Sequence, residues 1–280
     1  MNVILSPALG AVKRISQIGN GLSKLALVWV CLVLFVAIFA VWIVPHDPSA
    51  IQGIPLPAPP DASFWFGTDE IGRDIFSRLI IGTQVTVRIV CFSVVLALFV
   101  GSALGLIAGY FGGFVGTIIM RFMDALLAFP MLVLALAIVT LLGPGEVNAI
   151  LAIGIVNVPK FARLVRGEVL TLMHREYITA ARSIGVSNLR IMLVHIWPNL
   201  FGNVIVFASL AAAHALITES ALSFLGLGVQ PPNPSWGGMI SAGMSQLDSW
   251  WIVLFPGLAI FLLVLSLNII GDLTRDAFDV

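Results

Sequence analysis

The sequence predicts an all-α, polytopic membrane protein with six transmembrane helices, and three observations support this prediction. The 280 residues are 59% hydrophobic and 10% charged, whereas soluble domains are about 45–50% apolar and about 25% charged. Several uncharged stretches approach or exceed the roughly 20 residues that a helix needs to cross the hydrocarbon core. Lysine and arginine gather in alternate connections between these stretches. We therefore expect an integral membrane protein, in which lipid surrounds the excess of apolar side chains.

The first two membrane helices are predicted from their length and lack of charge. Residues 25–44 contain no charged residue and exceed the roughly 7–15 apolar residues of a cleaved signal segment, so this helix is predicted to be retained. Residues 89–110 are also uncharged. Their stripe of Gly101, Gly105 and Gly109 is typical of closely packed membrane helices. The stripe's partner, within this chain or in another subunit, stays open at this stage.

Four further membrane helices complete the predicted set. Arg121 and Asp124, near the start of the third helix, are three residues apart, a spacing that allows an ion pair. The uncharged part of the fourth helix ends at Pro159, and the fifth carries His214 and Glu219. These four helices are predicted at about 116–142, 147–166, 199–224 and 250–271.

Positive charges predict that both termini are cytoplasmic, because lysine and arginine concentrate in inner loops. Six crossings leave Arg73, Arg78 and Arg88 outside. The inner segments then hold Lys13, Arg14, Lys24, Arg121, Lys160, Arg163, Arg166, Arg175, Arg182, Arg190 and Arg275. The predicted organisation is a cytoplasmic segment 1–24, a first helix 25–44, an outer segment 45–84 and a five-helix domain 85–280 with an inner loop at 167–198.

Several kinds of site are absent from the sequence. No G-x-x-x-x-G-K-[ST] phosphate loop occurs, and no lysine follows a glycine, so ATP binding by that route is excluded. No metal site and no cofactor are predicted in this chain, because the four histidines are scattered and the two cysteines lie in apolar stretches. The net charge of zero gives no electrostatic case for a nucleic-acid partner.

The inner loop at 167–198 predicts a helix–turn–helix. A helix over about 165–184 would end at Gly185, since glycine adopts the left-handed conformation that terminates helices. Ser187 can cap the next helix, and Pro198 suits the first turn of the one that follows. The alternative is a basic amphipathic helix that lies on anionic lipid.

The motif Ala180-Ala181-x-x-x-Gly185, with Pro198 thirteen residues later, resembles the EAA loop of binding-protein-dependent ABC importer permeases. In that family the loop docks on a separate ATPase subunit. Thr179 stands where the family has glutamate, and His195 and Trp197 replace an isoleucine and a leucine. The resemblance implies ATPase-coupling roles for Glu176, Thr179, Ala180, Ala181, Arg182, Gly185, His195 and Pro198.

Four other stretches resemble a narrower group, the C-type permease of dipeptide, oligopeptide and nickel importers. They are Phe66–Arg78, Met120–Asp124, Glu219–Gly228 and Asn268–Asp276. The resemblance implies a type I importer fold in the bacterial cytoplasmic membrane, with a B-type permease, two ATPase subunits and an outer substrate-binding protein as partners. ATP and magnesium are expected in those ATPases. The chain would be a transport subunit for di- or oligopeptides, with nickel or another small solute as the alternative. Whether the second permease is distinct or another copy stays open.

Polar groups outside the coupling loop each have two interpretations. His214 and Glu219 either line a translocation path or gate, or bond to a neighbouring helix. Asp69, Arg73, Asp74 and Arg78 either contact the binding protein or pair with one another. A rival of a different class is an ion-driven secondary transporter, which would need an intramembrane ion site. A membrane-embedded enzyme would need a catalytic pair that the sequence does not display.

Overall fold

The computed structural model describes residues 21–51, 57–246 and 248–278. Of the predicted cytoplasmic segment 1–24, residues 1–20 lie outside this described part. The described residues form helices, with an isolated bridge between Thr68 and Asp74. In chain order the helices are α2 (Gly21–Ile43), α3 (Ile75–Phe111), α4 (Gly113–Leu127), α5 (Met131–Leu142), α6 (Glu146–Met173), α7 (Glu176–Ser183), α8 (Asn188–Arg190), a π-helical turn η1 (Ile191–Ile196), α9 (Trp197–Phe224), α10 (Trp236–Gly243) and α11 (Trp251–Phe278).

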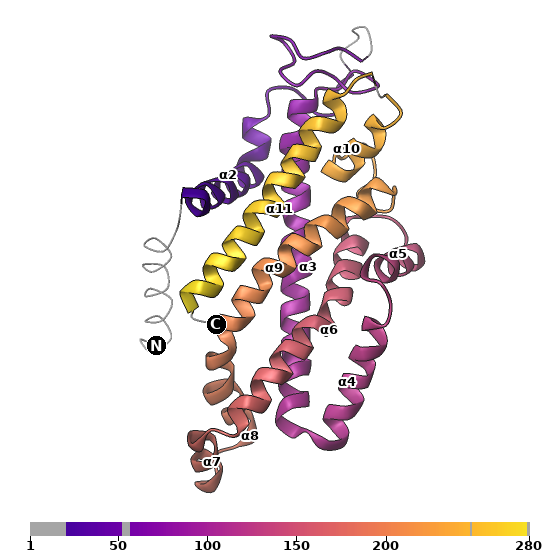
Figure 1. The fold of residues 1–280 in the computed structure, drawn as a ribbon. Helices are drawn as coiled ribbons and strands as arrows, with labels where there is room; N and C mark the ends of the chain where they lie inside the picture. Colours follow the sequence, from indigo (N-terminus) through magenta and orange to yellow (C-terminus); the bar gives the residue numbers. More distant parts are fainter. Residues whose placement is uncertain (1–20, 52–56, 247, 279–280) are drawn as a thin grey trace.

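The long helices run side by side in one bundle, with short helices at its two ends (Figure 1). We call these the α7 end and the α10 end. Within the described residues, α2, α3, α6, the run from α8 to α9, and α11 are long and apolar enough to cross a membrane. The bent pair α4 and α5 makes a sixth span if it is counted as one. The all-α membrane fold is confirmed.

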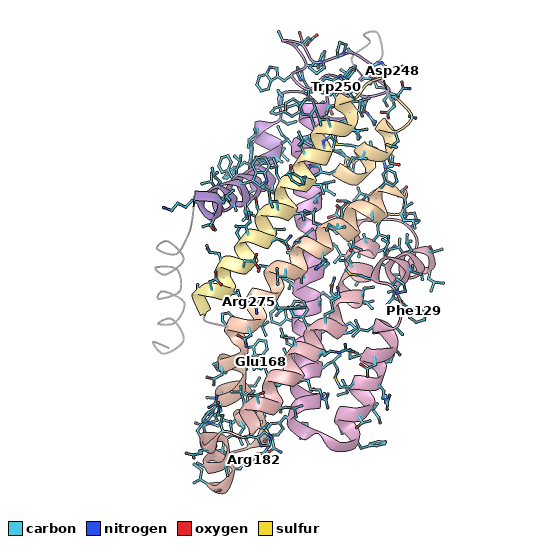
Figure 2. The ribbon with its side chains drawn as sticks, in the orientation of Figure 1. Phe129, Glu168, Arg182, Asp248, Trp250 and Arg275 are labelled. Atoms are coloured by element: carbon cyan, nitrogen blue, oxygen red, sulfur yellow. The ribbon has the colours of Figure 1, made fainter. Side chains whose placement is uncertain are left out.

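The third predicted helix is broken, which is a correction to the sequence analysis. α4 ends at Leu127 and α5 begins at Met131, with a bend of 93° between them. Pro130 precedes α5 and has no N–H to continue the helical bonding of α4, and its ring also disfavours helical geometry at Phe129. Figure 2 places Phe129 at this bend. The apolar run 116–142 therefore predicted a membrane segment correctly but a continuous helix wrongly.

α3 is the longest helix, and its predicted start near residue 89 was too late. It begins at Ile75 because Asp74 caps it, accepting hydrogen bonds from the backbone N–H groups of Phe76 and Ser77 at 3.2 Å each. At 1.5 Å per residue its 37 residues span about 55 Å, more than the thickness of a bilayer with its headgroups. The first part of α3 carries Arg78 and Arg88, and the prediction, which required an uncharged stretch, therefore began only after them.

The glycine stripe of α3 packs against α6, so its partner lies within the chain. A Cβ built on Gly105 would lie 2.5 Å from the carbonyl oxygen of Ala162, and one on Gly109 would lie 2.7 Å from the Cβ of Val169. Gly101 faces Phe161 in the same way, at 2.6 Å from its Cβ. Small residues let two helix backbones approach closely and gain dispersion contacts along their length.

Two tryptophans fasten the α10 end of the bundle. Trp236, at the start of α10, is buried and donates its indole N–H to the carbonyl oxygen of Leu79 at 3.2 Å. Trp251 donates to the carbonyl oxygen of Thr68 at 3.1 Å. Each bond joins segments more than 150 residues apart in the sequence (separations of 157 and 183). The connection before α3, α10 and the start of α11 therefore form one packed unit.

The α3–α6 contact makes a testable prediction. Gly105→Ala should lower the thermal unfolding midpoint of the detergent-solubilised protein, because its methyl group meets backbone and overpacking costs about 1–3 kcal/mol. Gly167→Ala is the matched control in α6, since nothing lies within 4 Å of its added Cβ. The control should stabilise the protein by up to about 1 kcal/mol through helix propensity. Equal midpoints for the two variants would contradict the close contact.

Candidate functional site

The tip at the α7 end is formed by two short helices rather than one. α6 continues to Met173 and α7 starts at Glu176, so the single helix predicted over 165–184 was wrong. Arg175 lies between them in an extended conformation, with φ −75° and ψ 141°. This break turns α7 away from the line of α6 and places it at the extremity of the bundle (Figure 1).

Gly185 ends α7, as predicted. Its φ is +77°, in the left-handed region that favours glycine. Its N–H donates to the carbonyl oxygen of Arg182 at 3.0 Å, and the N–H of Val186 donates to that of Ala181 at 3.1 Å. This pair of bonds is the Schellman motif, which satisfies the last carbonyls of a helix. The direction of α7 is thus fixed at both of its ends by backbone geometry.

The two adjacent alanines of α7 face different ways. Ala181 is buried together with Ile178, and these side chains hold α7 to the bundle. Ala180 is exposed, as are Tyr177 and Thr179. Ile184, at the end of the helix, is 81% exposed, and an exposed cluster of apolar groups on a membrane protein's polar end is typical of a contact surface. Only Ala180 of the pair is available to another protein.

Arg182 fastens α7 to the end of α3. Its guanidinium lies 5.1 Å from the ring centroid of Tyr110, within the range of a cation–π interaction. The Tyr110 hydroxyl donates to the Asn188 side chain at 2.7 Å. Figure 2 shows Arg182 at this tip. Tyr110 and Asn188 were not among the predicted site residues, because nothing in the sequence spacing indicates that α3 ends beside α7.

The rest of the predicted loop continues without interruption into α9. Ser187 takes the N-cap position of α8, but its side chain makes no capping bond. Pro198 lies in the first turn of α9, as predicted. His195 belongs to the π-helical turn, and its carbonyl oxygen accepts a hydrogen bond from the Asn199 side chain at 2.7 Å. Insertions of π-helix occur frequently at functional positions.

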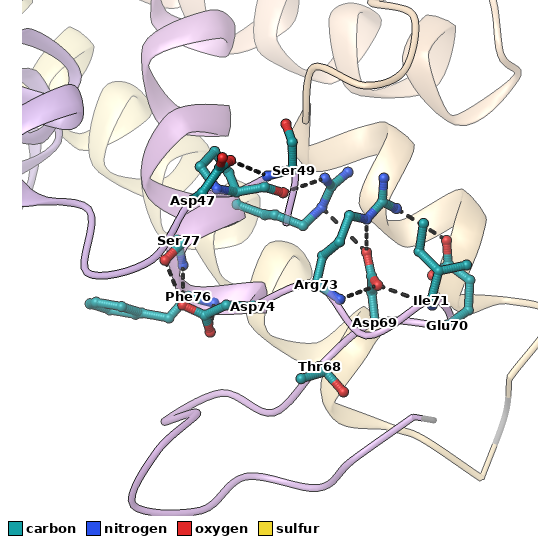
Figure 3. Close-up of polar contacts among 12 residues, drawn as sticks. Asp47, Ser49, Thr68, Asp69, Glu70, Ile71, Arg73, Asp74, Phe76 and Ser77 are labelled. Atoms are coloured by element: carbon teal, nitrogen blue, oxygen red, sulfur yellow. Dashed lines mark hydrogen bonds and ion pairs between the residues drawn. The ribbon is translucent and has the colours of Figure 1, made fainter. Parts of the chain in front are cut away.

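At the α10 end, three of the four predicted charged residues, Asp69, Arg73 and Arg78, bond to one another, and Asp74 has other partners (Figure 3). Asp69 is 4% exposed and binds Arg73 Nε at 2.7 Å and Arg78 Nε at 3.4 Å. Its other oxygen accepts the backbone N–H groups of Ile71 at 3.1 Å and Arg73 at 2.9 Å. Asp74 caps α3 and also contacts His46 Nδ1 at 3.1 Å. We call Asp69, Arg73 and Arg78 the Asp69 cluster.

A cavity of about 300 Å³ opens beside the Asp69 cluster. Gln230, Asn233 and Ser241, from the segment between α9 and α10 and from α10 itself, line its other side. The cavity thus lies between the segment before α3 and the segment between α9 and α10, both of which were predicted to be outside the membrane on its outer side. Asp69, Arg73 and Arg78 line the cavity, but their shortest contacts are with one another.

The two candidate gate residues of α9 do not come together. Glu219 is fully buried and accepts hydrogen bonds from the hydroxyl groups of Ser223 at 2.8 Å and Ser220 at 3.4 Å, both on its own helix. His214 is exposed on the surface of this chain. Glu219 therefore has partners within α9, and only His214 faces outward.

Asp124 has a different partner from the one predicted. Its carboxylate lies 2.7 Å from Arg163 Nη2 of α6, so the expected pair with Arg121 was wrong among the described residues. α4 itself packs against α6, which places Asp124 beside Arg163.

Comparisons with known proteins agree with this architecture. The family model described as binding-protein-dependent transport system inner membrane component matches residues 101–279. A di/tripeptide transport system permease protein of Pseudomonas aeruginosa is 45% identical over 260 residues, covering 90% of this chain and 86% of that protein. A glutathione transport system permease protein of Pectobacterium atrosepticum is 42% identical over 90% of this chain and 84% of its own length. A probable D,D-dipeptide transport system permease protein of Escherichia coli is 41% identical over 93% and 88%.

The Asp69 cluster makes a stability prediction. Asp69→Ala should lower the thermal unfolding midpoint in detergent by several degrees, because losing one member of a buried ion pair costs about 3–5 kcal/mol. Asp61→Ala is the matched control, since Asp61 is exposed and caps only local backbone N–H groups; it should cost about 1 kcal/mol or less. A midpoint for Asp69→Ala equal to that of the control would show that the cluster adds no stability.

Proposed function

Because this chain belongs to the family of binding-protein-dependent transport system inner membrane components, we propose that it moves short peptides across the membrane by alternating access. It is a permease subunit of a bacterial inner membrane transporter. The proposal concerns its cargo, its partners and the way in which energy reaches it. The observation that carries it is the exposed, rigidly oriented helix α7 at one end of the bundle.

Peptide cargo is supported by the relatives and their range. Their names specify di/tripeptides, D,D-dipeptides and glutathione. These compounds share an amide backbone, at least one free carboxylate and an amino group. The common chemistry favours short peptides over nickel as the cargo of this chain.

Energy is proposed to come from separate subunits. The chain has no phosphate loop, so ATP and magnesium would be bound by two ATPase subunits that dock at α7. Ala180 leaves room for a close approach, and Ile184 offers an apolar contact. A second permease of the B type would cover the bundle's remaining face, and an outer binding protein would deliver the cargo at the α10 end.

The fold supports transmission from α7 to the opposite end. α7 is held to α3 through Arg182 and Tyr110, and α3 is held to α6 along the glycine stripe. Closure of the ATPase pair would therefore tilt α3 and α6 as one body. To move the bundle from 1:99 to 99:1 in favour of the outward-open state, ATP binding must favour that state by about 5.5 kcal/mol.

Purification of the tagged chain tests its partners. The chain, extracted gently from its native membrane, should copurify with a second permease and ATPase subunits, identified by mass spectrometry. Cells that lack this chain should lose accumulation of labelled dipeptides and regain it with the wild-type gene. Recovery of the folded chain alone, with transport driven by an ion gradient, would instead support a secondary transporter.

Gly185 tests the coupling role of α7. Gly185→Val should lower both peptide uptake and the ATPase stimulation by binding protein about tenfold, because a β-branched residue at positive φ costs about 1–2 kcal/mol and redirects the helix end. Gly185→Asn is the matched control, since asparagine tolerates the left-handed conformation and nothing lies within 4 Å of a Cβ there. It should keep most of the activity. Full coupling in both variants would remove α7 from the energy path.

A further inference from the structure

Tyr110 lies where three elements of the α7 end meet. It is the last residue but one of α3, and it is 7% exposed. The guanidinium of Arg182, in the last turn of α7, lies over its ring, and its hydroxyl donates to Asn188, the first residue of α8. Arg182 and Asn188 stand on either side of the turn at Gly185. One side chain of α3 therefore holds both sides of that turn.

The chain connection between α6 and α7 is a weak route for force. α6 ends at Met173 and α7 starts at Glu176, and Arg175 between them is extended, with φ −75° and ψ 141°. A short non-helical break can absorb a load through changes in φ and ψ, as hinges do. The connection keeps α7 close to α6, but it does not by itself oblige α6 to follow when α7 is pulled.

The apolar contacts of α7 hold it without fixing its direction. Ile178 and Ala181 are buried, and apolar burial is non-directional. The contacts of Tyr110 are directional, because a hydrogen bond needs alignment and a cation–π contact needs the cation over the ring face. Arg182 Nη2 also lies 3.5 Å from the sulfur of Met173, so this guanidinium meets the ends of both α3 and α6.

The residue next to Tyr110 belongs to the contact between α3 and α6. A Cβ built on Gly109 would lie 2.7 Å from the Cβ of Val169. A displacement of Tyr110 would therefore press α3 against α6 and be shared by both helices.

We propose that Tyr110 is the positioning residue through which movement of α7 reaches the α3–α6 pair. The proposal rests on the proposed function, since it needs an ATPase that docks at α7. It adds a named contact on which the amount of cargo moved for each ATP hydrolysed depends, separately from the docking surface itself.

Tyr110→Leu tests this role in the complete transporter, reconstituted in proteoliposomes with its binding protein and a labelled dipeptide. Because both directional contacts are lost, transport per ATP hydrolysed should fall about tenfold. Copurification of the subunits and ATP hydrolysis without binding protein should stay as in the wild type. Tyr110→Phe keeps the ring and loses only the hydrogen bond, so its loss should be smaller, about threefold. Phe114→Leu is the matched control, since Phe114 is 80% exposed near the start of α4, and it should behave as the wild type.

A double-mutant cycle with Arg182→Leu separates coupling from a general loss of packing. Residues that act through one contact are not additive, so the double variant should transport no less per ATP than Tyr110→Leu alone. Fully additive losses would overturn the proposal. A lower thermal unfolding midpoint of Tyr110→Leu with unchanged transport per ATP would also overturn it, because the role would then be structural only.

Gly185→Val distinguishes this proposal from docking at α7. If Gly185→Val uncouples the transporter and Tyr110→Leu does not, α7 acts through another contact, and the role of Tyr110 is overturned while docking stands. If neither variant lowers transport per ATP, α7 lies outside the energy path and both proposals are overturned.

Discussion

The close contact between α3 and α6 is the constraint on which the rest of the structure depends. Three glycines at intervals of four residues, Gly101, Gly105 and Gly109, leave that part of one face of α3 without side chains, so α6 lies directly against it there. In lipid there is no hydrophobic drive to bring helices together, and dispersion along such a face must supply the association. The pair forms a long rigid body that extends from the α7 tip toward the Asp69 cluster. The other membrane helices pack around it, and the tip and the cluster are held in fixed relation.

The two ends of this body differ in how they treat polar groups. At the α10 end the chain satisfies its own charges: Asp69 receives two arginines and two backbone N–H groups, and Asp74 caps α3. These bonds hold an irregular segment in one conformation beside the cavity. At the α7 end the internal bonds orient α7 but leave its outer surface uncovered. The first arrangement fixes the irregular segment beside the cavity, and the second leaves the outer side of α7 exposed.

Sequence patterns predicted the features that depend on local chemistry. Gly185 and Pro198 occupy the positions assigned to them because left-handed backbone and a missing N–H are properties of single residues. The failures concern choices between partners. The sequence allowed Asp124 to bind Arg121, but the packing of α4 against α6 gave it Arg163. The glycine stripe indicated a close contact without naming α6. Hydrophobic periodicity reports that a face is buried and cannot report against which helix.

α7 follows α6 directly in the chain, so its position is tied to the α3–α6 pair. Two residues, His174 and Arg175, separate the end of α6 at Met173 from the start of α7 at Glu176. Val169 and Ala162 of α6 already lie against Gly109 and Gly105 of α3, so sliding along α3 would drive them onto larger side chains. A force on α7 would therefore tilt the pair as one body instead of sliding one helix along the other. Such a tilt would move the two ends of the pair together, so that a change imposed at α7 would reach the α10 end, which is the physical requirement of alternating access.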